Sequence, residues 1–363
     1  MKRDHVLVIN PGSTSTKIAV YQGETQCFQE NLIHDANDLA VFSHVAEQFE
    51  YRKEAILKSL ERHQILPEQL IAVVGRGGLL RPMPSGTYKV TMPMIKDLQV
   101  GIQGEHASNL GGILAKSIAD SEAIESYIVD PVAVDEFIPL ARISGIPQIK
   151  RKSLVHALNI RAIAKRYSKE INKPFETLNL IVAHLGGGIS IAPIKQGKII
   201  DVNNANEMGP FSPERVGSLP VGALSALCFS GKCTYPEMKR KMRGRGGLVG
   251  YLGTNDARDV LKRIEAGDEE AKLVFDAMGY QIAKEIGAMA TVIEGKVDAI
   301  LITGGVAYAK YLTDAVESRV KFIAPVFVMP GEDEMGALNL GVLSVLGGKE
   351  NAKIYEEEVA LDD

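Results

Sequence analysis

The chain contains no tryptophan, only three cysteines and no apolar run long enough to span a membrane. Without tryptophan, and with scattered tyrosines and phenylalanines, it offers no stacking platform for single-stranded nucleic acid. Its formal net charge of −4 gives no reason to expect nucleic acid or an acidic membrane as a partner. Cys27, Cys228 and Cys233 are odd in number and wrongly spaced for zinc, which predicts free thiols. Because the first residues also lead into a strand without a signal-peptide core, we expect a cytoplasmic protein.

The length and composition predict a globular protein of two domains. With 363 residues, the chain exceeds the size at which a single hydrophobic core usually stops growing. Its apolar fraction of 45% and charged fraction of 24% are ordinary for a soluble globular protein.

The most informative feature is a motif that occurs twice, each time as an apolar strand, a turn of small residues and a second strand. The first copy has its turn at 10–17 and the second has its turn at 184–188. Glycine turns let backbone N–H groups approach an anion, and Ser, Thr and Lys add donors and charge. Two such turns predict two similar domains that close on a nucleotide.

Periodicity between these turns predicts alternating helices and strands. Apolar residues at helical spacing predict helices over 38–63, 153–170 and 269–294. Short buried strands are expected at 70–74, 127–129, 298–302 and 325–329. Asp130 lies at the carboxyl end of one of these strands, where ligands of open α/β sheets gather.

The first turn differs from a Walker P-loop, which joins a strand to a helix. Lys17 follows a Gly-Ser-Thr loop, but residues 18–21 alternate like a strand. This hairpin resembles the superfamily of acetate and sugar kinases, Hsp70 and actin. The resemblance implies an α/β fold of two ribonuclease-H-like (actin-like ATPase) domains, each with a mixed five-stranded sheet flanked by helices. The expected domains are 1–152 with a C-terminal helix in 335–363, and 153–334.

Within that superfamily, the chain resembles the short-chain acyl kinases of the acetokinase family over essentially its whole length. Asn10, Ser13, Ser15 and Lys17 match the family's opening Asn-x-Gly-Ser-x-Ser-x-Lys. Further counterparts occur in the family's order at 106–109, 211–215, 253–258 and 330–334. The implied reaction transfers a phosphoryl group between ATP and a carboxylate, and gives an acyl phosphate.

The site of such a reaction needs fixed cations and hydrogen-bond donors more than a general base, because a carboxylic acid is already ionised at neutral pH. Charge instead spreads over the moving phosphoryl group. Arginine suits it because a planar guanidinium pairs with two oxygens and stays charged. The resemblance implies catalytic roles for Arg76, Asp130, His156, His184 and Arg215.

The resemblance also implies ATP or ADP and Mg²⁺ as cofactors. The expected nucleotide and phosphate ligands are Asn10, Ser13, Ser15, Lys17, Gly186, Gly187, Gly188, Asp256, Arg258, Gly304 and Gly305. Mg²⁺ keeps most of its waters and needs only one or two carboxylates. Asn10 and Glu334 are the expected magnesium residues, with Glu332 and Asp333 as alternatives.

Two departures from acetate kinase bear on the substrate. Gly77 and Gly78 stand where acetate kinase has valines, and Gly187 stands where it has asparagine. Replacing valine with glycine should leave space for a longer acyl chain, so Gly78 is expected to border the substrate tail. The expected acid is therefore butyrate or a branched relative such as isobutyrate.

Three alternatives remain open at this point. One is acetate or propionate as the preferred acid. Another is a sugar or polyol kinase, in which Asp130 would deprotonate a hydroxyl group. The third is a non-catalytic, actin-like nucleotide-binding scaffold. The expected partners are a short-chain fatty acid or acyl phosphate and further copies of the chain, as a dimer or a multiple of dimers.

Overall fold

The computed structural model describes residues 3–361, and its chain divides into two compact units. The first comprises Met1–Asp135 and Asp333–Asp363, and the second comprises Glu136–Glu332. The sequence suggested boundaries at 152/153 and 334/335. The first boundary in the structure, at 135/136, falls earlier than the suggested one. The reason is that the Ile138 N–H donates to Ile200 O, which joins the segment after Asp135 to the second unit.

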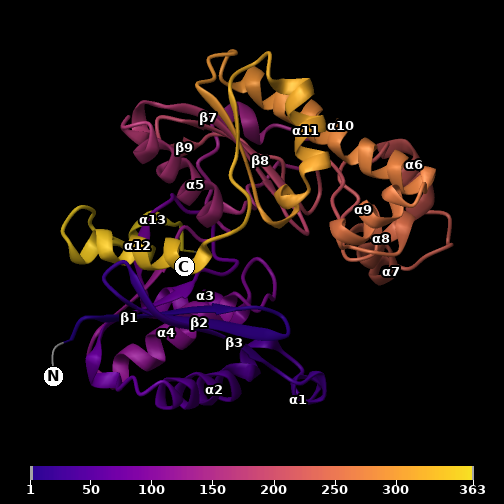
Figure 1. Cartoon of the computed structure of the whole chain (residues 1–363). Coiled ribbons are helices and arrows are strands. Elements are labelled where there is room, and N and C mark those ends of the chain that lie inside the picture. Colours follow the sequence, from indigo (N-terminus) through magenta and orange to yellow (C-terminus); the bar gives the residue numbers. More distant parts are fainter. Residues whose placement is uncertain (1–2, 362–363) are drawn as a thin grey trace. The chain divides into compact units, whose positions relative to one another are not determined.

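The first unit is built on a seven-stranded sheet with the order β12-β5-β6-β4-β1-β2-β3 (Figure 1). Its strands are β1 His5–Pro11, β2 Ser15–Gln22, β3 Thr25–Ile33, β4 Leu70–Arg76, β5 Thr87–Lys89, β6 Glu125–Val129 and β12 Lys353–Ile354. The expected five strands are all present, and two short strands, β5 and β12, extend the sheet at the β6 edge. The expectation of five strands was therefore wrong for this unit. The missed strands are three and two residues long, too short to show a period in the sequence.

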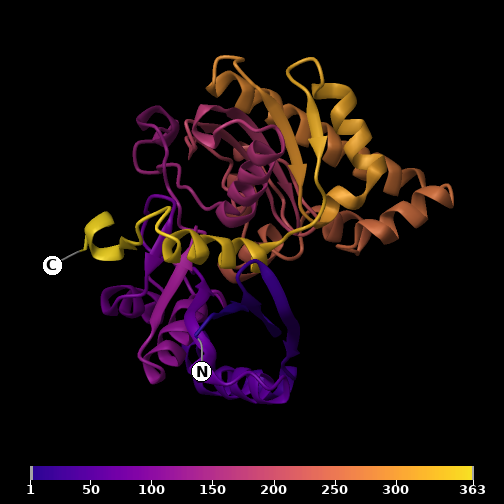
Figure 2. The same ribbon diagram turned by 60° about the vertical axis from the view of Figure 1, so that its left-hand side comes forward.

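Helices cover both faces of this sheet. They are α1 Ala36–Ala40, α2 Phe49–Arg62, α3 Met92–Val100, α4 Asn109–Ser121, α12 Glu334–Leu346 and α13 Tyr355–Glu358. The apolar faces of α2, α3 and α4 share one core with Leu7 and Ile9 of β1. The C-terminal helix α12 packs on β1, β4 and β6, and Figures 1 and 2 both draw it, in yellow, against the sheet of the first unit.

The predicted continuous helix over 38–63 is wrong at its N-terminal part. The chain forms α1, then a short 3-10 helix at Val45–Gln48, then α2. The break at Ser43 and His44 is stabilised because both backbone N–H groups donate to the Glu47 carboxylate. This arrangement caps a new helix start, so the helical spacing resumes after the interruption.

The second unit has a five-stranded sheet with the order β11-β10-β7-β8-β9. Its strands are β7 Asn179–Leu185, β8 Ile189–Lys195, β9 Lys198–Ile199, β10 Ala299–Thr303 and β11 Val326–Val328. Its helices are α5 Ala157–Glu170, α6 Val221–Cys228, α7 Tyr235–Met242, α8 Gly247–Leu252, α9 Ala257–Glu265, α10 Glu269–Val292 and α11 Lys310–Val320. This unit therefore has the predicted strand number and repeats the hairpin of the first.

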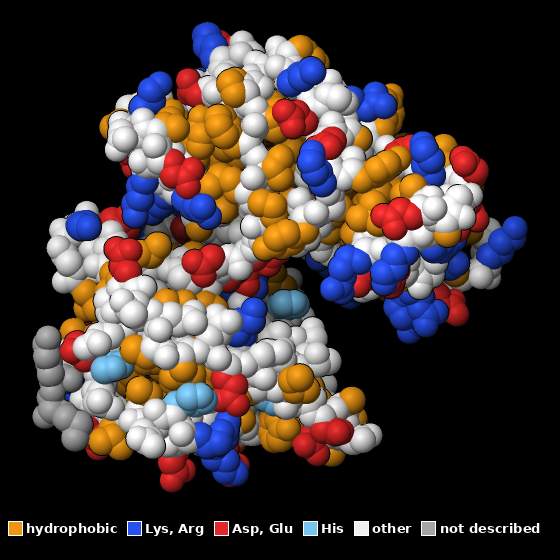
Figure 3. Space-filling view, viewed as in Figure 1, with side chains coloured by type: hydrophobic (Ala, Val, Ile, Leu, Met, Phe, Trp, Pro, Cys, Tyr) orange, Lys and Arg blue, Asp and Glu red, His pale blue; other side chains and the backbone are white. Residues whose placement is uncertain are grey.

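Alternation along β7 sends neighbouring residues to opposite faces of the sheet. Ile181, Ala183 and Leu185 face the core formed with α10, so His184 points toward α5. Basic side chains gather over α7, at the right of Figure 3. No helix within residues 3–361 has the length and apolar character needed to cross a membrane.

Candidate active site

Asn10, Arg76 and Glu334 come together in the first unit because of sheet register and helix placement. Ile9 of β1 pairs with Gly75 of β4, so the next residues, Asn10 and Arg76, are neighbours on adjacent parallel strands. Leu7 and Ile9 face α4, and alternation therefore directs Asn10 to the face that α12 covers. Glu334 is the first residue of α12.

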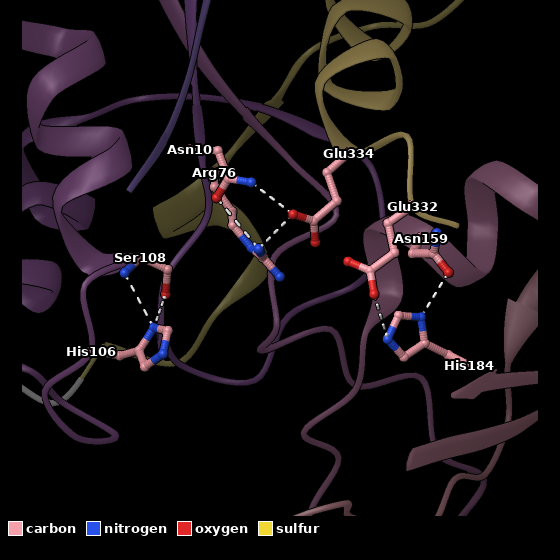
Figure 4. Close-up of polar contacts among 8 residues, drawn as sticks. All are labelled: Asn10, Arg76, His106, Ser108, Asn159, His184, Glu332 and Glu334. Carbon is pink, nitrogen blue, oxygen red and sulfur yellow. Dashed lines mark hydrogen bonds and ion pairs between the residues drawn. The ribbon is translucent and has the colours of Figure 1, made fainter. Parts of the chain in front are cut away.

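The three side chains form a connected polar group (Figure 4). Asn10 Nδ2 donates to Glu334 Oε2 at 2.7 Å, and an Arg76 guanidinium nitrogen donates to the same oxygen at 2.7 Å. That nitrogen also lies 3.4 Å from Asn10 Oδ1. The Arg76 side chain is 23% exposed and that of Glu334 is 13% exposed. The pair is therefore shielded from water on most sides yet open to a ligand.

The three carboxylates of the acidic run 332–334 make different contacts. Glu332 lies 3.3 Å from His184 Nε2. Asp333 caps α12 by accepting the Gly336 N–H at 2.9 Å. Of the three, Glu334 is the one that hydrogen-bonds Asn10, and its role as the magnesium residue stays a prediction.

The bend after Arg76 is packed against the start of α4. A Cβ on Gly78 would lie 2.4 Å from Asn109 Oδ1 and 2.6 Å from Asn109 Cα. A Cβ on Gly77 would lie 2.4 Å from Pro131 Cβ. The interpretation of Gly78 as free space beside a substrate tail is therefore wrong, because its missing side chain makes room for the backbone of α4.

Asp130 occupies a strained position in the strand-to-loop turn. Its φ is +39°, which is uncommon for a residue with a side chain. Its N–H donates to Gly86 O at 3.0 Å, and its Oδ1 accepts the Gly86 N–H at 2.8 Å. Asp130 is buried and fixes the loop that contains Gly86.

His106, in one of the family-like stretches, lies beside the start of α4 in the first unit. Its Nδ1 contacts Ser108 Oγ at 2.8 Å and the Ser108 N–H at 3.2 Å (Figure 4).

His156 and His184 form a stacked pair in the second unit, with ring centroids 4.1 Å apart. Asn159 Oδ1 lies 2.8 Å from His184 Nδ1, and Ser190 Oγ lies 2.9 Å from His156 Nδ1. Glu332 contacts the other nitrogen of His184 (Figure 4). His184 is only 2% exposed. These contacts fix both ring orientations, which suits donors that must meet a ligand in one geometry.

Arg215 lies directly over the second glycine turn. A Cβ on Gly188 would lie 2.2 Å from a terminal nitrogen of its guanidinium, so only glycine leaves this space. Burial lowers the pKa of Arg215, as does Arg243, while Glu214 opposes the shift. Within residues 3–361, no carboxylate is within ion-pair distance of the Arg215 guanidinium. A cation without an ion-pair partner beside a glycine turn is well suited to an anionic ligand.

A pocket of about 640 Å³ lies in the second unit. Its lining residues are Gly187, Pro213, Glu214, Asn255, Asp256, Ala257, Arg258, Leu261, Gly305, Val306, Tyr308 and Ala309. Four expected nucleotide residues are among them: Gly187, Asp256, Arg258 and Gly305.

The other expected nucleotide residues lie outside that lining. Gly186 and Gly188 belong to the turn beside it, and Gly304, at φ +92°, is packed against Leu185 O. Ser13, Ser15 and Lys17 belong to the first unit, where Ser13 and Lys17 are exposed.

Asp256 and Arg258 form an ion pair at 2.6 Å, and Arg258 lowers the pKa of Asp256 to about 2. Sequence reasoning missed Glu214, Asn255 and Tyr308. Glu214 and Asn255 lie inside the family-like stretches 211–215 and 253–258. These stretches could have predicted them, if every residue in each stretch had been considered as a possible pocket residue. Asn255 donates to Glu214 at 2.6 Å across the pocket wall.

Known proteins share the sequence and the fold of this chain. The profile of the acetokinase family matches residues 148–324. Butyrate kinase 2 of Clostridium acetobutylicum is 55% identical over 97% of this chain and 99% of its own length. A probable butyrate kinase 2 of Caldanaerobacter subterraneus subsp. tengcongensis is 56% identical over 96% of this chain and 99% of its own.

Solved structures show the same fold. Acetate kinase of Porphyromonas gingivalis superposes with a TM-score of 0.79 at 21% identity, covering 94% of this chain and 100% of that one. A propionate kinase of Francisella tularensis subsp. tularensis gives 0.75 at 18% identity, over 94% and 99%. The likeness to relatives above 50% identity extends over nearly the entire sequence. The chain therefore belongs to the acetokinase family.

Proposed function

We propose that the protein transfers a phosphoryl group reversibly between ATP and a short-chain carboxylate, butyrate or a branched relative such as isobutyrate. The observation that carries the proposal is the near full-length identity of 55% and 56% to relatives named butyrate kinase 2 and probable butyrate kinase 2. The grouping of Asn10, Arg76 and Glu334 at the ends of neighbouring elements supports the same chemistry.

The carboxylate substrate needs no general base, because it is ionised at neutral pH. The protein must instead offset the charge that spreads over the transferring phosphoryl oxygens. Arg76 and Arg215 would supply fixed positive charge, and both can use two guanidinium nitrogens for one group. His156, oriented by Ser190, would donate a hydrogen bond to a phosphoryl oxygen. His184, oriented by Asn159, would do so when its Nε2 exchanges the Glu332 contact for the ligand.

Mg²⁺ fits the donors present in the first unit. Asn10 offers an amide oxygen and Glu334 a carboxylate, both hard oxygen ligands of the kind Mg²⁺ accepts. No cluster of three or more acidic, His or Cys groups able to hold a metal occurs among residues 3–361. A single carboxylate is consistent with a Mg²⁺ ion that is held mainly through waters and phosphate oxygens. The ion would neutralise the negative charge of those oxygens.

The pocket in the second unit would hold the nucleoside part of ATP. Its volume of about 640 Å³ falls within the range of small-molecule sites. Asp256, Asn255 and Glu214 offer acceptors for ribose or base donors, and Tyr308 and Leu261 offer an apolar wall.

The sugar or polyol kinase alternative requires Asp130 as a base. The Asp130 carboxylate accepts the Gly86 N–H, and the residue is buried. This arrangement favours a role in holding the loop over proton abstraction from a hydroxyl group.

A hydroxamate assay over C2 to C6 straight and branched acids tests the proposal, because hydroxylamine traps acyl phosphates. We expect kcat/KM to be highest for butyrate or isobutyrate. A methylene in an apolar pocket contributes about 1–3 kcal/mol, so the ratio over acetate should be roughly ten-fold or more. Phosphorylation of sugars or polyols, with no acyl hydroxamate from any acid, would favour the hydroxyl-kinase alternative.

We also propose a cytoplasmic homo-oligomer, a dimer or a multiple of dimers. The free state of Cys27, Cys228 and Cys233 supports a reducing compartment. Light scattering of the purified protein tests the assembly, and a mass of one 39.3 kDa chain at micromolar concentration would contradict it.

A further inference from the structure

Arg52 of α2 is fully buried beneath the first glycine turn, at 0% exposure. One terminal nitrogen donates to Gly12 O at 2.9 Å and to Ser15 O at 3.0 Å, and the other donates to Ser13 O at 3.2 Å. Gln48 Oε1 accepts from the guanidinium at 3.0 and 2.8 Å. A single side chain therefore holds three carbonyl groups of the turn.

Within residues 3–361, no ion-pair partner balances the charge of Arg52. Within the described part of the chain, no carboxylate forms an ion pair with it, and its side-chain neighbours Gln48 and Thr16 are neutral. Burial lowers the pKa of Arg52. A buried cation that is not paired costs free energy, so a benefit elsewhere is required to explain it.

The bonds to Arg52 determine where the N–H groups of the turn point. In a trans peptide the carbonyl of one residue and the N–H of the next point in opposite directions. Because Gly12 O and Ser13 O point at Arg52, the N–H groups of Ser13 and Thr14 point away from it. Both residues are exposed, and neither N–H donates to a group in the described part of the chain.

We infer that Arg52 is a positioning residue for an oxyanion cradle formed by the Ser13 and Thr14 N–H groups. It aims the two donors outward, and its uncompensated charge makes the electrostatic potential of the turn more positive. Adjacent N–H groups that converge in a turn bind anions. The ligand class is a phosphoryl group, and this identification rests on the proposed function.

The variant Gln48→Glu separates charge from geometry. Glutamate has the shape of glutamine and keeps both acceptor contacts to Arg52, but it places a negative charge against the guanidinium. The fold should remain intact, with an unchanged or higher melting temperature, because a buried cation gains a partner. The anion affinity of the turn should fall because the positive potential is cancelled.

The readout is titration of ¹⁵N-labelled protein with inorganic phosphate, followed through the Ser13 and Thr14 amide resonances. We expect Gln48→Glu to raise the apparent dissociation constant about ten-fold, the effect of losing one charge-assisted interaction. kcat should fall as well, while the KM for ATP stays near the wild-type value. Arg52→Met removes both the charge and the hydrogen bonds, whereas Arg52→Lys keeps the charge without the planar guanidinium. The phosphate affinity of Arg52→Lys should therefore lie between those of wild type and Arg52→Met.

Arg62→Met is the matched control, since Arg62 lies on the same helix in an exposed pair with Glu30. It should leave phosphate affinity and kcat unchanged. A folded Gln48→Glu protein with wild-type phosphate affinity at Ser13 and Thr14 would overturn the inference. The phosphate titration does not depend on butyrate turnover, so a failure of the proposed function would show separately, as a wild-type protein without acyl kinase activity.

Discussion

Arg76 and Arg215 sit in different surroundings, and this difference sets what each can do. Arg76 is paired with Glu334 at 2.7 Å, whereas Arg215 has no ion-pair partner within residues 3–361 and lies over Gly188. A paired arginine is held in one orientation before a ligand arrives. An unpaired, largely buried arginine has lost hydrating water without gaining an ion-pair partner. A bound anion therefore stabilises it more than it would stabilise a paired arginine.

Arg76→Ala should lower kcat by about a hundred- to a thousand-fold, as loss of one preorganised donor to a transition state does. The KM for ATP should change little, since the pocket proposed for the nucleoside lies in the other unit. Arg76→Lys should rescue poorly because the two-nitrogen fork is lost. Steady-state kinetics check this, with Arg166→Ala on the surface of α5 as control. Near-wild-type turnover in Arg76→Ala would show that the site is centred elsewhere.

Gly188→Ala should reduce activity without unfolding the protein. The new Cβ would lie 2.2 Å from the Arg215 guanidinium, and the end of a long side chain can move away at small cost. The displaced cation should then fail to meet its anion, with a loss in kcat/KM of about ten-fold or more. Gly145→Ala, whose Cβ would meet nothing within 4 Å, should have wild-type kinetics. Equal kcat/KM in the two alanine variants would argue against a role for Arg215.

At the scale of elements, the close contact between the end of β4 and the start of α4 positions Arg76. A Cβ on Gly75 would lie 2.0 Å from Gly111 O, and one on Gly111 would lie 2.2 Å from Arg76 O. Together with Gly78 against Asn109, these glycines let the two backbones touch on both sides of Arg76. The sequence analysis assigned Gly78 to the substrate tail, whereas the structure packs it against the backbone of α4.

Gly78→Ala should therefore destabilise the protein, with no gain of selectivity for short acids. Its Cβ would meet the backbone of Asn109 at 2.6 Å, and backbone cannot move aside as a side-chain tip can. Overpacking of this kind lowers the free energy of unfolding by about 1–3 kcal/mol. Urea unfolding measures it, and Gly145→Ala serves again as control. An unchanged free energy of unfolding, with a shifted butyrate-to-acetate ratio, would restore the substrate interpretation.

His34, at the end of β3, makes the stability of the first unit sensitive to acid. Burial and the nearby Arg52 lower the pKa of His34 from its ordinary value of 6.5 to about 4, and its Nε2 lies 2.8 Å from Thr16 Oγ. Between these two values the unfolded chain binds the proton and the folded chain does not. The free energy of unfolding is therefore not reduced by His34 above pH 6.5, and it declines as the pH falls from 6.5 toward 4.

The free energy of unfolding should fall by up to about 3 kcal/mol over that window, at most about 1.4 kcal/mol per pH unit. His34→Gln removes the titrating group, so its stability should decline less steeply across the same range. Urea unfolding at several pH values compares the two slopes. Parallel pH profiles for wild type and His34→Gln would contradict the assignment.

At the scale of the molecule, the repeated hairpins and the helical periods were enough to predict two α/β domains and the strands that carry Asn10, Arg76 and His184. These features are local, because a strand and its turn are encoded by neighbouring residues. The ion pair between Arg76 and Glu334, the hydrogen bonds of Arg52 to the first turn and the lining of the pocket by Tyr308 could not be predicted. They join residues that only the folded backbone brings together.

³¹P NMR of the reverse reaction can detect phosphoryl transfer between a carboxylate and a nucleotide without any coupling enzyme. The purified protein would be mixed with butyryl phosphate, ADP and Mg²⁺. We predict that the acyl phosphate resonance is replaced by the γ-phosphoryl resonance of ATP, and that Arg76→Ala slows this exchange about a hundred-fold or more. Release of inorganic phosphate without ATP, or no reaction with the folded wild-type protein, would show that the protein does not catalyse this transfer.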